Sequence, residues 1–196
     1  MALINKEANE IHCKVVYYGP SLSGKTTNIQ WIYQKTAGEG RSDLMEFNTN
    51  PERTMFFDFL PMDVGNIRGL KARFHLYTVP GQVVYDASRK LVLKNLDGLI
   101  FVADSQMERM DENVESLRNL EKNLEQQGYD IKAMPLVIQY NKRDLPNAAP
   151  LAELRTALNR YNAPDFEATA QIGRGVLETL MTVSKQIVTK LKGGEI

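Results

Sequence analysis

Residues 19–26 of this chain, GPSLSGKT, place two glycines, a lysine and a threonine at the spacing of a loop that binds phosphate groups. Gly19 and Gly24 let the backbone bend until successive N–H groups face an anion. Lys25 supplies a mobile positive charge for the terminal phosphates of a nucleotide, and the Thr26 hydroxyl is a suitable ligand for the accompanying Mg²⁺. The predicted contacts in this stretch are Gly19, Ser21, Leu22, Ser23, Gly24, Lys25, Thr26 and Thr27.

The residues on either side of this loop have the pattern that a phosphate loop requires. An apolar, β-branched run at 15–18 precedes it, and a run with helical periodicity follows at 27–35. Such a helix adds the positive end of its dipole to the anion site. The alternative is a glycine-containing turn that binds nothing, and the flanking pattern favours the phosphate loop.

A second motif, Asn141, Lys142 and Asp144, follows the apolar run at 136–140 and has the chemistry to select a purine. The Asp144 carboxylate can accept from both N1–H and the exocyclic amine of guanine, whereas adenine lacks both donors. The Lys142 stem can lie along the purine face, and the Asn141 amide can bond the base and brace the phosphate loop. Alone, these residues would also suit an ordinary turn, but together with the phosphate loop they predict guanine nucleotide binding.

Strand and helix patterns alternate along the chain and must bring these motifs together. We predict strands at 15–18, 56–60, 71–77, 99–103, 136–138 and 166–170, and helices at 27–35, 85–96, 110–127, after Pro150 and at 176–191. Turn residues at 61–69 predict an antiparallel hairpin between the second and third strands, and 41–53 form a polar loop.

This alternation predicts an α/β fold in which helices cover both faces of a mostly parallel sheet with one antiparallel strand. Ligands of such sheets bind beyond the carboxyl ends of the strands, where both motifs fall. The mixed charges at 108–122 predict a solvated helix face. An apolar stripe in the last helix predicts core packing, through Val176, Leu180, Val183, Ile187 and Leu191.

Composition limits the classes of function that the chain can serve. Its 196 residues suit one domain, and 24 basic residues balance 24 acidic ones, so no long-range field recruits nucleic acid or an anionic membrane. The single cysteine, Cys13, predicts an inert core thiol. No apolar run reaches membrane-spanning length, and neither Ala2 nor residues 192–196 encode lipidation, so we expect a cytoplasmic protein without a direct membrane anchor.

The motifs resemble those of a known family. Residues 19–26, 78–82 (TVPGQ) and 141–144 are similar to the Ras-like small GTPases. Longer segments at 16–20, 52–54, 56–61 and 73–82 resemble, more narrowly, the MglA family of bacterial Ras-like GTPases, and the likeness runs from about residue 5 to 190. It implies a single G domain over residues 1–196 with the P-loop GTPase fold.

The resemblance also implies roles for residues outside the phosphate loop. Thr54 matches the threonine that binds Mg²⁺ and senses the γ-phosphate, and Gly81 matches the backbone donor to that phosphate. Gln82 matches the residue that orients the attacking water, and Arg53 matches an intrinsic arginine finger. Ala170 matches the N–H donor to the guanine oxygen. Next to it, Gln171 stands where many Ras-like proteins have lysine.

Two residues depart from the usual Ras-like pattern. Thr78 replaces an aspartate that supports Mg²⁺ through water, although MglA proteins share the threonine. The loss of that negative charge predicts weaker Mg²⁺ retention when the γ-phosphate is absent. Ser21 replaces a glycine beside the catalytic glutamine, where a hydroxymethyl group either slows hydrolysis by displacing Gln82 or is small enough to be harmless.

These observations lead us to expect a GTP-hydrolysing switch, slow without an activating partner, in which γ-phosphate and Mg²⁺ order loops near 48–54 and 81–88. The resemblance implies a role in cell polarity and surface motility, with recruitment to a pole through partners. Those partners are a Roadblock-type activating protein and response-regulator-type effectors. Two alternatives are a GTP-binding scaffold with little hydrolysis, which Ser21 and Thr78 support, and a phosphotransferase, which the guanine motif opposes.

Overall fold

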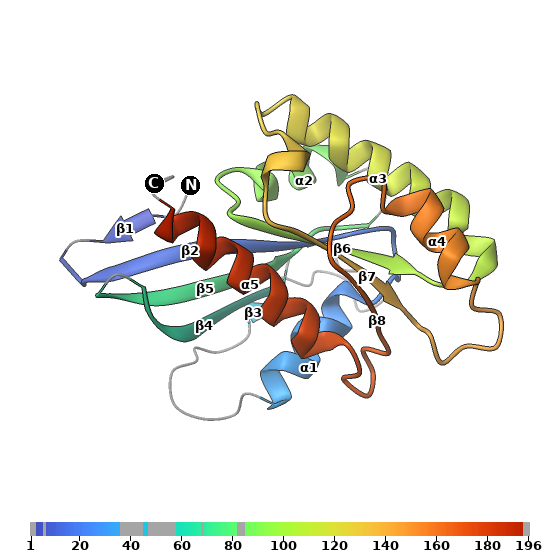
Figure 1. Cartoon of the computed structure of the whole chain (residues 1–196), viewed down its shortest axis with the longest axis horizontal. Helices are drawn as coiled ribbons and strands as arrows, with labels where there is room; N and C mark the ends of the chain where they lie inside the picture. The colour runs from blue at the N-terminus through green and yellow to red at the C-terminus, as the bar shows by residue number, and fades with distance from the viewer. Residues whose placement is uncertain are drawn as a thin grey trace.

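The computed structural model describes residues 3–5, 7–35, 45–46, 58–67, 69–81 and 85–193, which form a central β-sheet with helices on both faces (Figure 1). The strand order is β3-β4-β5-β2-β6-β7-β8, with β1 paired to β2 off this path. Pairing is parallel from β5 through β2, β6 and β7 to β8, and antiparallel for β1 with β2, β3 with β4 and β4 with β5. The predicted α/β fold class is confirmed.

The strands of the sheet are β1 (Leu3–Asn5), β2 (Glu10–Tyr18), β3 (Met45–Glu46), β4 (Asp58–Ile67), β5 (Leu70–Thr78), β6 (Gly98–Asp104), β7 (Leu136–Asn141) and β8 (Asp165–Glu167). The α-helices are α1 (Lys25–Lys35), α2 (Asp86–Leu93), α3 (Met110–Glu125), α4 (Leu151–Leu158) and α5 (Val176–Lys192). A short 3₁₀ turn, η2 (Met107–Arg109), leads into α3.

Two apolar cores hold the helices to the sheet. One joins α1 and α5 to one face and includes the predicted α5 stripe, so the expectation of core packing for that stripe is confirmed. The other joins α2, α3 and α4 to the opposite face. Cys13 lies fully buried in the first core, where burial raises the pKa of its thiol to about 12, as expected for an inert thiol.

The predicted hairpin is present, but its first strand is longer than expected. β4 continues to Ile67, although residues 61–69 were expected to form the connection. The turn signal at 63–66 instead coincides with a shift of register between β4 and β5, because a bulge lets an antiparallel ladder accommodate turn residues and continue. Residues 56–57 of the predicted strand lie outside the described residues.

Other boundaries differ by a few residues, and two short strands were not predicted. α2 stops at Leu93 rather than at 96, since Lys94 is extended and Asn95 has a left-handed φ of 56°. β8 ends at Glu167, so residues 168–170 form a loop instead of a strand end. β1 and β3 extend the sheet through antiparallel pairs that such short runs do not signal by periodicity.

A buried polar network fixes the start of α1 beneath the phosphate loop. The Asn28 and Gln139 side-chain amides exchange hydrogen bonds of 2.9 and 3.0 Å, and Gln139 Nε2 also donates to Thr179 Oγ1 at 3.1 Å. Asn28 Nδ2 donates in addition to the Gly24 carbonyl at 2.9 Å. Since all three side chains are fully buried, the network ties α1, β7 and α5 together at one level of the sheet.

Candidate functional site

The carboxyl ends of four strands carry the predicted site residues. Residues 19–26 follow β2, Gly81 lies just beyond β5, Asn141 closes β7, and residues 168–171 follow β8. Because β2, β5, β7 and β8 run parallel, these segments meet at one edge of the sheet, as predicted.

The phosphate loop has the backbone conformation of an anion-binding loop. Gly19 and Gly24 have φ values of 144° and 97°, and Leu22 takes a left-handed φ of 62°. A Cβ at Gly19 would lie 2.2 Å from the Val102 carbonyl oxygen, so that position requires glycine. Turns of this kind point backbone N–H groups into a shared concavity that suits phosphate oxygens.

Two buried polar groups of this loop fit a phosphate ligand. Lys25 is only 7% exposed, and its ammonium donates to the carbonyls of Gly19 and Pro20 at 3.1 and 2.6 Å. Ser23 Oγ is fully buried and has no hydrogen-bond partner within the described part of the chain. A buried hydroxyl normally finds a partner, so its position in the loop suits a bound anion.

Asn141 joins the base motif to two other loops. Its Nδ2 donates to the Ser23 carbonyl at 2.8 Å, and its Oδ1 accepts the Ala170 N–H at 2.9 Å. The predicted bracing of the phosphate loop is therefore present. A Cβ at Gly24 would lie 2.2 Å from Asn141 Nδ2, which explains the need for glycine there. The guanine contact expected of the Ala170 N–H would have to share this donor with Asn141.

The remaining residues of the base motif point in different directions. Lys142 has a left-handed φ of 64°, and its ammonium pairs with Asp104 Oδ2 at 2.7 Å. Arg143 Nε donates to Glu167 Oε2 at 2.9 Å, and its Nη1 donates to the Ala149 carbonyl at 2.7 Å. Asp144 and Gln171 are exposed beside these anchored residues. An exposed Asp144 carboxylate on a fixed turn remains available to a purine edge, as its predicted role requires.

Two charged residues of the site were missed by the sequence analysis. Asp104, which is fully buried at the end of β6, holds Lys142, and its sequence signal is a carboxylate directly after the apolar run 99–103. Arg109 donates from Nη2 to the Ser21 carbonyl at 2.8 Å. The predicted solvated face at 108–122 is thus wrong at Arg109, because the 3₁₀ turn before α3 directs that side chain onto the phosphate loop.

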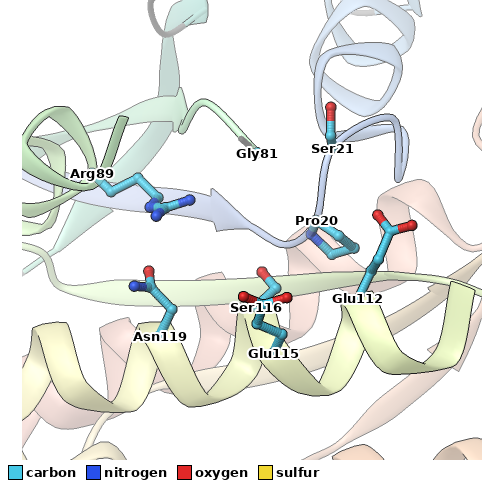
Figure 2. Close-up of a pocket in the computed structure, with 8 residues that line it drawn as sticks. All are labelled: Pro20, Ser21, Gly81, Arg89, Glu112, Glu115, Ser116 and Asn119. Carbon is cyan, nitrogen blue, oxygen red and sulfur yellow. The ribbon is translucent and has the colours of Figure 1, made fainter. Parts of the chain in front are cut away.

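Gly81 packs directly on the phosphate loop. A Cβ at Gly81 would lie 2.4 Å from both N and Cα of Ser21. Figure 2 shows Gly81 and Ser21 on one side of a small cavity of about 70 Å³ and α3 on the other. The cavity is lined by Pro20, Ser21, Gly81, Arg89, Glu112, Glu115, Ser116 and Asn119. Gly81 therefore lies against Ser21, the residue that departs from the Ras-like pattern.

Three predicted residues, Arg53, Thr54 and Gln82, lie outside the described residues. Thr26, a predicted Mg²⁺ ligand, lies in the first turn of α1. Thr78, which replaces the aspartate of the Ras-like pattern, is buried at the end of β5. Throughout the described ranges, no group of three or more His, Cys, Asp or Glu side chains forms a metal cage. Hydroxyl ligands combined with phosphate oxygens suit Mg²⁺, which commonly takes only one or two protein ligands in nucleotide sites.

Comparison with known proteins decides the family. Residues 2–187 match the sequence model of the ADP-ribosylation factor family. The chain belongs to the ADP-ribosylation factor family. Membership makes the protein a small GTPase switch whose class binds guanine nucleotide with Mg²⁺ and hydrolyses GTP.

Individual relatives place the chain within this family. It is 60% identical over 194 residues to the mutual gliding-motility protein MglA of Myxococcus xanthus, which covers 99% of this chain and 100% of that protein. The human ADP-ribosylation factor-like protein 4A is 30% identical over 186 residues, 91% of this chain and 84% of its own length. Human ADP-ribosylation factor-like protein 4C is 28% identical over 185 residues, 91% of this chain and 88% of its own. The predicted resemblance to MglA is confirmed.

None of the helices in the described part of the chain combines the length and the apolar composition needed to cross a bilayer.

Proposed function

We propose that this protein hydrolyses GTP slowly by itself and acts as a partner-stimulated switch in cell polarity and surface motility. The observation that supports a guanine nucleotide site is Asn141, whose side chain bonds both the phosphate loop and the loop of Ala170. The proposed base motif and the phosphate loop are thereby joined by hydrogen bonds. The motility role draws on the 60% identity to a protein named for gliding motility.

The proposed catalytic residues are Gln82, which orients water, Arg53, which neutralises charge on the transferred phosphoryl group, and the Gly81 N–H, which contacts the γ-phosphate. Thr26 and Thr54 are proposed as the Mg²⁺ ligands from the protein. These assignments rest on the family resemblance and on the contact of Gly81 with the phosphate loop.

For partners, we propose a Roadblock-type activating protein and response-regulator-type effectors, with recruitment of the cytoplasmic protein to a pole through them. We propose no nucleic acid partner, in keeping with the balanced charge of the chain. Arg53 directly precedes Thr54, so a partner that fixes this segment would deliver both the arginine and the metal ligand. The partner then has no need to insert an arginine of its own.

Multiple-turnover GTP hydrolysis, with and without a Roadblock-type protein, tests this proposal. A guanidinium at the transferred phosphoryl group raises the rate by about 10³- to 10⁵-fold. We therefore expect Arg53→Ala and Gln82→Ala each to lose nearly all stimulated turnover while GTP affinity stays within about threefold. The matched control Arg160→Ala, on the exposed surface, should keep full stimulation. Full stimulation of Arg53→Ala would place the catalytic arginine elsewhere.

A GTP-binding scaffold remains the second candidate function. Ser21 supports it, because the Gly81 backbone lies directly against Ser21, and a hydroxymethyl group there narrows the space beside the catalytic segment. Turnover that stays negligible at saturating partner, together with tight GTP binding, would favour the scaffold.

A further inference from the structure

Arg109 is a second cationic side chain that contacts the phosphate loop, in addition to Lys25. It ends η2, directly before α3, and its side chain is 23% exposed. Nη2 donates to the Ser21 carbonyl at 2.8 Å, while Nη1 pairs with Glu112. Figure 2 shows Glu112 beside Pro20, on the side of the loop that faces α3. The Arg109 guanidinium therefore links the phosphate loop to Glu112 of α3.

The carbonyl that Arg109 holds belongs to the peptide unit between Ser21 and Leu22. In a planar trans peptide the C=O and N–H groups point in opposite directions. With the Ser21 carbonyl directed at Arg109, the Leu22 N–H must point away from the Arg109 guanidinium. Because the peptide unit is planar, a fixed Ser21 carbonyl also fixes the direction in which the Leu22 N–H can donate.

Leu22 needs such an external support. Its φ of 62° is a left-handed conformation that costs any residue with a Cβ, and its side chain is 72% exposed. An exposed side chain contributes little packing that would hold the strained backbone in place. The hydrogen bond from Arg109 to the preceding carbonyl supplies a contact that does so.

Asp104 fixes Arg109 in turn. Its Oδ2 lies 3.8 Å from Arg109 Nε and accepts from Lys142 Nζ at 2.7 Å. Asn113 holds the Asp104 backbone through bonds of 2.9 and 2.7 Å. The carboxylate itself is fully buried, and its Oδ1 accepts the Gln106 N–H at 3.1 Å. The buried Asp104 carboxylate thus lies between Lys142 of the base motif and Arg109, which contacts the phosphate loop.

We propose that Arg109 is a positioning residue for the phosphate loop, which holds the Leu22 N–H ready for the phosphates beyond the α-phosphate. The proposal rests on guanine nucleotide binding at this site. The loop backbone and Lys25 serve those outer phosphates, whereas the base motif serves the purine. GMP, which lacks the β-phosphate, is therefore insensitive to the Leu22 N–H, and GDP is sensitive to it.

Dissociation constants of the nucleotide-free full chain for GDP and GMP test this role. Arg109→Gln should weaken GDP about tenfold, the value of one hydrogen bond involving a charged group, and GMP less than twofold. Arg109→Lys keeps the charge and a donor, so it should recover GDP affinity to within about threefold. Arg118→Gln, at an exposed position of α3, is the matched control and should change neither constant.

Equal weakening of GDP and GMP by Arg109→Gln would overturn the proposal, since it would mark a general structural role. Unchanged GDP affinity would overturn it as well. A measurement that needs no variant guards against loss of folding: the Leu22 amide resonance of the unmodified protein should move with GDP and stay within line width with GMP. Equal shifts would contradict the proposal. Titration with ADP separates the two claims, because a missing preference for GDP contradicts the nucleotide assignment and not the role of Arg109.

Discussion

We propose that a single carboxylate, that of Asp144, selects guanine. It is exposed on a turn whose neighbours are anchored, with Lys142 on Asp104 and Arg143 on Glu167. We expect Asp144→Asn to weaken GDP about a hundredfold, because the amide presents a donor to the guanine N1–H and loses a charge-assisted bidentate pair. The variant should gain affinity for xanthosine diphosphate, whose C2 carbonyl accepts from the amide.

Competition binding with GDP and xanthosine diphosphate checks this prediction. Glu153→Gln, a carboxylate replacement on α4, should leave both affinities unchanged. An Asp144→Asn protein that still prefers GDP would remove Asp144 from the base site.

His75, in β5, is expected to make the folding stability depend on pH. His75 stacks on His12 with ring centroids 5.0 Å apart. Burial, the charge of His12 and the charge of Arg73 lower the pKa of His75 from 6.5 to about 4. Protons then bind the unfolded chain more readily than the folded one between these values, so folding stability should fall as the pH drops from 6.5 towards 4.

Urea unfolding at several pH values between 5 and 6.5 measures this slope. His75→Asn removes the titrating group and should flatten the dependence of the unfolding free energy on pH. The same slope in both proteins would assign the acid sensitivity to other groups.

Residue types and spacing were sufficient to predict the phosphate loop, because its glycines and Lys25 are chemically specific. They were insufficient for Arg109 and for the pairing of His12 with His75. Those contacts join residues far apart in the chain, Arg109 with Ser21 and His12 with His75 at 2.7 Å. Alternation and charge patterns report which face is apolar, and they carry no information on which distant carbonyl a surface arginine meets.

Gly81, just beyond the end of β5, has no room for a side chain. An alanine Cβ at Gly81 would lie 2.4 Å from Ser21 backbone atoms and 2.6 Å from the Pro20 carbonyl carbon. We expect Gly81→Ala to push this segment off the phosphate loop and slow stimulated GTP hydrolysis about a hundredfold, as misplacement of about 1 Å does at a reacting centre. GDP affinity should change less than threefold.

Turnover and GDP titration of Gly81→Ala provide the measurement. Gly193→Ala is the control, since a Cβ there makes ordinary contact at 3.4 Å with the Lys190 carbonyl oxygen. Normal turnover of Gly81→Ala would mean that the contact with Ser21 is not maintained during the reaction.

Gln139, in β7, hydrogen-bonds to both α1 and α5. Gln139→Ala would leave Asn28 Oδ1 without the Gln139 donor, remove one of the two bonds from Asn28 Nδ2 and open a cavity, so the unfolding free energy should fall by about 3 kcal/mol. Urea denaturation with an unchanged m-value measures the loss. The exposed replacement Gln126→Ala should change stability by less than about 0.5 kcal/mol. A loss this small for Gln139→Ala would show that the network is dispensable.

Element types could be predicted from periodicity, whereas several element ends could not. The long helices α3 and α5 have strong apolar spacing and begin at the predicted residues. β4 exceeds its prediction because pairing with β5 overrides the local turn preference of 63–66. β1 and β3 are stabilised by their partners in the sheet, so their own residues carry almost no signal.

At the scale of the whole molecule, the candidate site exists only because parallel strands bring distant loops to one edge of the sheet. The phosphate loop and Asn141 are far apart in sequence, yet Asn141 Nδ2 donates to the Ser23 carbonyl at 2.8 Å. The central claim is that this edge holds a guanine nucleotide by its base and its phosphates together.

Titration of the unmodified, nucleotide-free protein with GTP and with ATP, both with Mg²⁺, tests that claim most directly. A site built to pair with the N1–H and amino group of guanine rejects a base that lacks them by about 10⁴-fold. We predict tight binding of GTP and ATP binding weaker by about this factor. Comparable affinities for the two nucleotides would contradict the account.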